Sequence, residues 1–200
     1  MDITTLWKFS QGKHDRGNEK TQTEWRTEDD VISFEGTKSV LDWIHNFMFG
    51  ARPGKAYKDM KVNWYAHRGF KLKFKSIESQ LKEYLDSYVS DHLYVTGHSQ
   101  GAAIATLFHE WVKFNYPKLK VTTVVFASPR VISLLNFKRV KERWADVINV
   151  THWKDVVPKL PPFIFGFGHV GKRFRVDGKV KLSKAHVSYG DYGIEKIPLE

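Results

Sequence analysis

The segment GHSQG, residues 97–101, fits the pattern G-x-S-x-G and is a clear candidate for catalytic chemistry. A short β-rich run at 93–96 precedes it and a helical run of small residues follows from Ala102, as a nucleophilic serine on a sharp turn requires. A side chain at either flanking position would collide with the strand or the helix, which explains both glycines. We therefore predict that Ser99 is a nucleophile that attacks acyl carbonyl groups.

The same turn predicts how negative charge would be stabilised. Ser99 would lie at a helix N-terminus, where free N–H groups and the helix dipole favour an anion, so the N–H of Gln100 is a natural oxyanion donor. His98 is an unsuitable base because adjacent side chains on a tight turn point apart. The His-Glu pair at 109–110 resembles a zinc-binding helix, but Lys113 stands where the second histidine is needed. We expect neither a metal nor a cofactor.

A nucleophilic serine also needs a histidine base and a carboxylate that orients it, in the chain order Ser, Asp, His. Asp155 follows the apolar run VINVTHW, so it would lie at the carboxyl end of a strand, where sites form in open α/β sheets. Asp146 precedes that run and is expected at the opposite edge. The residues alone leave the base open between His169 and His186.

The elements that position these residues alternate between strands and helices. Near-continuous apolar runs, typical of strands buried on both faces, occupy 31–35, 93–96, 121–127 and 147–153. Apolar spacing of three and four from Ser76 and an apolar run from Ala102 predict helices. This order predicts a doubly wound, mostly parallel α/β sheet flanked by helices, in a single domain over residues 1–200. Asp177–Gly178 predicts a hairpin turn.

The chain is strongly basic, with a formal net charge of +10 over 200 residues. Such a surface attracts anionic partners. The basic residues form no nucleic-acid-binding motif, so a solvated surface is the first interpretation and an anionic membrane or lipid surface the second. The oligomeric state is left open.

The sequence contains no cysteine, which excludes a disulfide framework and a thiolate metal site. No stretch approaches the roughly 18 apolar residues of a membrane span. The first residues lack the basic start and apolar run of a secretory signal. We expect a cytoplasmic protein, with release or virus-borne delivery as alternatives.

Five ordered blocks between residues 31 and 190 resemble the class 3 lipases, whose familiar members are fungal triacylglycerol lipases. The blocks are VISFEGTKSVLDWIHNF (31–47), AHRGF (66–70), GHSQGAAIA (97–105), FASPRV (126–131) and HWKDVVPKLPP (152–162). The resemblance implies an α/β-hydrolase fold, with AHRGF as a short strand, and the hydrolysis of carboxylic esters. Glu35, Gln100 and Ala102 depart from the arginine, leucine and glycine that are usual there.

The resemblance also implies roles for particular residues. It places the orienting carboxylate at Asp155 and the base at His186, which begins an H-x-x-Y block. It implies that the backbone N–H of Thr37 is the second oxyanion donor, with its hydroxyl in support. His186 would then deprotonate Ser99, and the oxyanion would be held by Thr37 and Gln100.

Two apolar segments are candidates for binding substrate. The resembling lipases carry a lid, or its remnant, in the segment that corresponds to 38–49. Its apolar residues, which are either a lipid-facing surface or buried core, are Trp43, Ile44, Phe47 and Met48. The aromatic run PPFIFGFG, with Phe163 and Phe165, would line an acyl groove or dip into an interface.

A lipase acting on acylglycerols is the leading functional prediction. A phospholipase A acting on anionic membrane lipids is the close alternative, because the same triad would serve both. A non-catalytic module that kept the fold, and a nucleic-acid-binding protein recognised by charge alone, are weaker alternatives.

Overall fold

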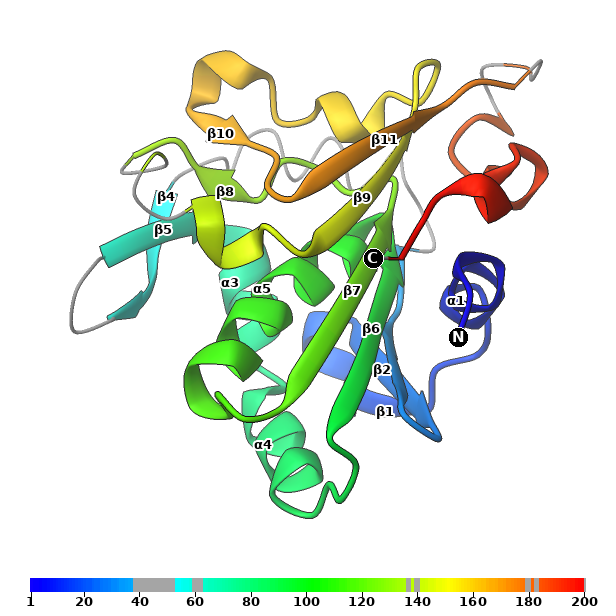
Figure 1. Ribbon diagram of the computed structural model, residues 1–200. Helices are drawn as coiled ribbons and strands as arrows, with labels where there is room; N and C mark the ends of the chain where they lie inside the picture. The colour runs from blue at the N-terminus through cyan, green and yellow to red at the C-terminus, as the bar shows by residue number, and fades with distance from the viewer. Residues whose placement is uncertain are drawn as a thin grey trace.

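The computed structural model describes residues 1–37, 53–58, 63–135, 138, 141–178, 181 and 184–199. A seven-stranded sheet in the order β1-β2-β3-β6-β7-β9-β11 forms its centre (Figure 1). Its strands are β1 (Arg16–Asn18), β2 (Thr23–Glu28), β3 (Val31–Phe34), β6 (His92–His98), β7 (Lys120–Phe126), β9 (Val147–His152) and β11 (Lys172–Val176). The five strands from β3 to β11 pair in parallel, and β1 and β2 add an antiparallel edge. The predicted doubly wound, mostly parallel sheet is confirmed.

Helices cover both faces of this sheet, which is why its strands are apolar on both sides. Figure 1 shows α3 (Arg68–Lys75), α4 (Glu78–Asp86) and α5 (Gln100–Asn115) on one side, and α1 (Ile3–Ser10) on the other. Adjacent strand residues accordingly belong to different cores: Val124 packs in the cluster beneath α1, and Val125 packs in the cluster beneath α5.

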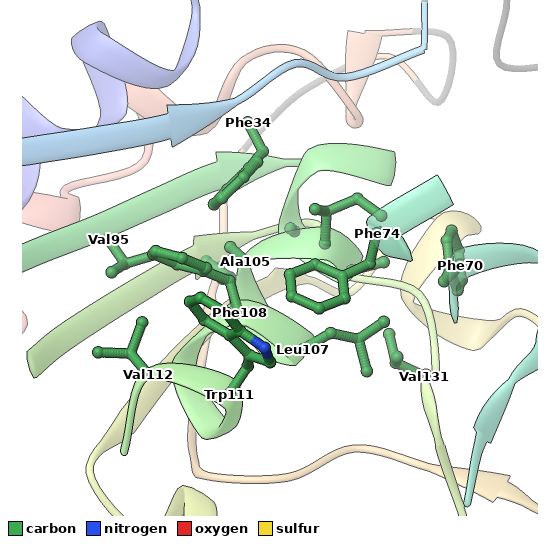
Figure 2. Packing of buried hydrophobic residues seen from close by; sticks show 14 of the residues in the cluster. Phe34, Phe70, Phe74, Val95, Ala105, Leu107, Phe108, Trp111, Val112 and Val131 are labelled. Carbon is green, nitrogen blue, oxygen red and sulfur yellow. The ribbon is translucent and has the colours of Figure 1, made fainter. Parts of the chain in front are cut away.

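The larger core fixes the position of α5 against the sheet. Phe108 of α5 meets Phe34 of β3 with ring centroids 5.2 Å apart, and both side chains are fully buried (Figure 2). Truncating such a phenylalanine typically costs about 3–5 kcal/mol. The helix that follows Ser99 is therefore anchored to the strand that leads to Thr37.

A second sheet, which the sequence did not predict, flanks the first. It pairs β4 (Pro53–Lys58), β5 (Asn63–His67), β8 (Ile132–Ser133) and β10 (Phe167–Gly168) in the order β10-β8-β5-β4, all antiparallel. Two of these strands have only two residues, too short to leave a periodic pattern in the sequence.

Two local predictions are wrong. The segment AHRGF is a strand only at its start: β5 ends at His67, whose Nδ1 accepts from the N–H of Gly69 at 3.1 Å and so caps α3. Asp177–Gly178 follows β11, but β11 pairs with β9 in parallel, and in the part of the chain that is described no strand follows to make a hairpin.

The chain also has short 3-10 turns, among them η3 (Val157–Lys159), η4 (Phe163–Phe165), η6 (Tyr189–Asp191) and η7 (Ile194–Lys196). Among the described helices, none is both long enough and apolar enough to span a bilayer.

Candidate active site

Ser99 lies on the turn between β6 and α5 with φ 57° and ψ −119°, a conformation that side-chain-bearing residues rarely adopt. Close packing on both sides enforces this strained turn. A Cβ on Gly97 would lie 2.5 Å from the carbonyl of Gly101, and one on Gly101 would lie 2.0 Å from the carbonyl oxygen of Phe34. The N–H of Ser99 donates to the carbonyl of Phe126 at 3.0 Å, which ties the turn to β7.

Asp155, which is buried, and the largely buried His186 form a hydrogen-bonded pair at the same end of the sheet. His186 Nδ1 lies 2.9 Å from Oδ2 and 3.1 Å from Oδ1 of Asp155, whose side chain is closed to solvent. Because the carboxylate accepts, the proton sits on Nδ1, and the neutral ring carries a lone pair on Nε2. His186 is therefore held in the tautomer that a general base needs.

Two further donors hold Asp155 in its ionised form. The Tyr189 hydroxyl donates to Oδ2 at 2.8 Å and the N–H of Val157 donates to Oδ1 at 2.9 Å. Burial alone would raise the pKa of Asp155, but these hydrogen bonds and the interaction with His186 outweigh it and lower the pKa. The carboxylate can then orient the imidazole and stabilise its protonated form.

Two buried reactive atoms lie at the centre of this arrangement. Ser99 Oγ and His186 Nε2 have no hydrogen-bond partner among the described residues. The His186 ring lies 4.5 Å from the ring of His98, the neighbour of Ser99, so the base lies close beside the turn that holds the serine. Both atoms are thus available for a proton transfer from serine to histidine during attack on a carbonyl, which would require Ser99 Oγ to donate to Nε2.

His98 holds the His186 backbone instead of acting as a base. Its Nε2 donates to the carbonyl oxygen of His186 at 2.7 Å. Burial, and then the charge of His186, lower the pKa of His98 to about 3, so its ring is neutral at ordinary pH. This placement agrees with the expectation that the adjacent histidine is not the base.

Thr37 and Gln100 are joined across the site. The Thr37 hydroxyl donates to Oε1 of Gln100 at 3.0 Å, and Nε2 of Gln100 donates to the carbonyl of Gln22 at 3.1 Å. The proton of the Thr37 hydroxyl is thus engaged by Gln100, which leaves the two backbone N–H groups as the candidate oxyanion donors. Gly36 brings this loop against the serine, because a Cβ on it would lie 3.7 Å from the Cβ of Ser99.

A family model described as lipase (class 3) matches residues 31–165 of this chain, more than half of it. The chain belongs to the class 3 lipase family. It is 29% identical over 152 residues to secreted mono- and diacylglycerol lipase 1 of Fusarium solani, covering 74% of this chain and 44% of the relative. It is 28% identical over 151 residues to the chloroplastic phospholipase A(1) DAD1 of Arabidopsis thaliana, covering 66% and 34%. The chain spans less than half the length of these two relatives.

The fold also superimposes on the triacylglyceride lipase of Rhizomucor miehei with a TM-score of 0.69 at 23% identity, covering 82% of this chain and 65% of that one. This match confirms the expected α/β-hydrolase fold, with its mostly parallel sheet flanked by helices.

In this class 3 lipase the alternative acid and base lie elsewhere. His169 Nε2 donates to the carbonyl of Pro158 at 2.6 Å, and its Nδ1 faces the amide of Asn149 at 3.2 Å, so the structure brings His186 and not His169 to Asp155. Asp146 lies at the opposite edge of the sheet, at the start of β9.

The His-Glu pair of α5 has structural partners. His109 is fully buried between Thr123 at 2.9 Å and Asp146 at 3.1 Å. Glu110 forms a short ion pair with Arg143. These contacts explain the pair without a metal.

The structure describes only one of the two predicted substrate-binding segments. Trp43, Ile44, Phe47 and Met48 lie outside the described residues. Phe163 and Phe165 lie on η4 and are 63% and 44% exposed, so they are surface residues in this class 3 lipase. Their part in substrate binding stays a prediction.

Sequence reasoning missed three groups that hold the site together. The H-x-x-Y spacing places Tyr189 three residues after His186, a separation that could have suggested a contact with the same carboxylate. The carbonyl of Gln22 and the role of His98 toward His186 leave no pattern in the sequence, because both are contacts between distant segments.

Proposed function

We propose that this class 3 lipase is a carboxylic ester hydrolase that acts on lipids, with acylglycerols as the leading substrate class. Ser99 is the nucleophile, His186 the general base and Asp155 the residue that orients it. The observation that carries the proposal is the buried Asp155–His186 hydrogen bond, which directs a lone pair onto Nε2 beside the strained Ser99 turn.

The reaction follows from these groups. Nε2 of His186 takes the Ser99 proton as Oγ bonds to the ester carbonyl carbon, and the carbonyl oxygen becomes an oxyanion between the N–H groups of Thr37 and Gln100. The imidazolium then protonates the leaving alcohol as the C–O bond breaks. Water, deprotonated by His186, attacks the acyl-enzyme and releases the fatty acid and Ser99.

Phospholipase A activity is the second candidate, because it needs the same triad and differs only in how the lipid is held. The strongly basic chain favours an anionic membrane surface as a partner, and one relative is named a phospholipase A(1). The names of the two relatives describe them as secreted and chloroplastic, so the expected cytoplasmic location of this chain stays a prediction.

The test is hydrolysis of p-nitrophenyl butyrate, monoolein, triolein and phosphatidylglycerol by wild type and Ser99→Ala. Removing the nucleophile should lower kcat by about 10⁶ on any true substrate. The ratio of rates on monoolein and phosphatidylglycerol then separates the two candidates. Equal, negligible rates for both proteins on all four esters would refute the proposal and favour a binding module.

A further inference from the structure

A cavity of about 380 Å³ lies away from Ser99 and is lined by two arginines from different elements. Arg130 follows β7 and Arg173 lies on β11. The remaining lining residues are Leu134, Phe163, Gly168, His169 and Gly171. None of these residues belongs to the Ser99, His186 and Asp155 arrangement described above.

The positive charge of this cavity is not neutralised within the described part of the chain. Neither arginine forms an ion pair there, and the sequence from 156 to 176 contains no aspartate or glutamate. Burial, and then the charge of Arg173, lower the pKa of Arg130, so the two guanidinium groups are close enough to repel each other. An anion with several oxygens would relieve this repulsion.

Arg130 is held in place before any ligand arrives. Its Nη1 donates to the carbonyl of Pro161 at 2.8 Å and, through a short hydrogen bond, to the carbonyl of Lys159. Nη2 and Nε have no described acceptor, so they are left to meet a ligand. A fixed guanidinium fork suits the paired oxygens of a phosphate group.

The apolar turn η4 borders the cavity through Phe163. Its three consecutive side chains are exposed: Phe163 by 63%, Ile164 by 86% and Phe165 by 44%. Figure 1 shows η4, in orange-yellow before β10, at the end of the molecule toward which the strands of the central sheet point. Exposed apolar side chains beside a cationic cavity match a membrane surface, where phosphate lies directly above acyl chains.

We propose that the Arg130–Arg173 cavity binds the phosphate of an anionic phospholipid while η4 enters the outer acyl region. This docks the protein on the bilayer that holds its substrate, a consequence that rests on the proposed lipid hydrolysis. The phosphate recognised here is a docking group, separate from the ester cleaved at Ser99.

The experiment is co-sedimentation with phosphatidylcholine vesicles, with and without one-fifth phosphatidic acid, using Ser99→Ala protein so that no lipid is consumed. Circular dichroism confirms folding of each variant. We expect binding only to the vesicles that contain phosphatidic acid, and an affinity at least about tenfold lower for Arg173→Gln, because charge-assisted hydrogen bonds are lost as well as charge. Ile164→Ser should weaken binding without changing its dependence on phosphatidic acid.

Arg175→Gln is the matched control, since Arg175 is exposed on the same strand and does not line the cavity. Losing one surface charge should weaken its binding by no more than about fivefold. Arg173→Lys should still bind the vesicles more weakly than the wild type, because lysine keeps the charge but lacks the guanidinium fork.

Equal losses for Arg173→Gln and Arg175→Gln would show diffuse attraction and overturn the site. Equal binding to both vesicle types would also overturn it. So would a thermal shift by inorganic phosphate that depends on Arg173, if the protein binds no vesicles. Vesicle binding by a wild type that hydrolyses no ester would instead refute only the proposed function.

Discussion

Replacing Gln100 by leucine, the residue usual in the family, tests how the oxyanion donors are held. The Gln100 side chain is almost fully buried, and it accepts from the Thr37 hydroxyl at 3.0 Å while donating to the carbonyl of Gln22 at 3.1 Å. Leucine fills a similar volume but can neither accept nor donate a hydrogen bond. The variant therefore removes the link between the Thr37 loop and the helix while leaving the backbone N–H at position 100 in place.

The expected losses follow from these two hydrogen bonds. Each contributes about 0.5–1.5 kcal/mol net, and leaving the Gln22 carbonyl without its donor adds to that, so we expect destabilisation of about 1–3 kcal/mol. This corresponds to a fall in Tm of roughly 2–12 °C for a chain of this size. Complete loss of one oxyanion donor costs about 10²–10³ in kcat, so a displaced Thr37 should cost about tenfold. KM should change little, because the oxyanion forms only in the transition state.

The chain offers a matched control for this variant. Gln80 also accepts from a side chain and donates to a carbonyl, from Trp25 at 3.1 Å and to Gly17 at 3.0 Å, but it lies away from Ser99. Gln80→Leu should lower Tm by a similar amount and leave kcat on p-nitrophenyl butyrate unchanged.

Thr37→Val completes the test as a double-mutant cycle with Gln100→Leu. Because both changes break the same link, the double variant should lose little more activity than either single one. Equal kcat losses in the two glutamine variants, or fully additive losses in the cycle, would refute the reasoning.

Three further predictions concern the fold and the charges of the site. Gly101→Ala should prevent folding to soluble protein, because its Cβ would lie 2.0 Å from the Phe34 carbonyl oxygen; wild-type Tm in the variant would contradict this. Tyr189→Phe should destabilise the protein by about 1.5–3 kcal/mol at pH 7 by removing a donor to Asp155. Since folding lowers that pKa, the stabilisation is present above about pH 4 and is lost as pH falls further, so the difference between the urea melts of the two proteins should shrink below about pH 4. The His98 ring, with its pKa lowered to about 3, should show no NMR titration between pH 5 and 8.

The sequence predicts best what rests on local pattern. The four apolar runs predicted four of the five parallel strands, β3, β6, β7 and β9. The pattern G-x-S-x-G between a strand and a helix predicted the turn at Ser99. The predicted strand places Asp146 before β9 and Asp155 after it, as the structure has them, so the two carboxylates lie at opposite edges of the sheet.

Contacts between distant segments were beyond prediction from the residues alone. His169 and His186 look alike in the sequence, and only the packing of the C-terminal segment brings one of them to Asp155. The second sheet was missed in part because β8 and β10 have only two residues each and so carry no periodicity. The hairpin was wrong because β11 found a parallel partner in β9, and tertiary pairing overrides a turn signal.

The base and the nucleophile are tied to the same turn by a residue that does not react. Within the described residues 184–199, the chain around His186 forms no α-helix or strand, and the contacts of the His186 ring and carbonyl help to fix its position. His98 holds that carbonyl at 2.7 Å and is bonded directly to Ser99 along the chain, so a shift of the serine turn also moves the support of the base. A buried, neutral histidine is suited to this task, because a charged ring there would be repelled by the imidazolium that the proposed mechanism forms on His186.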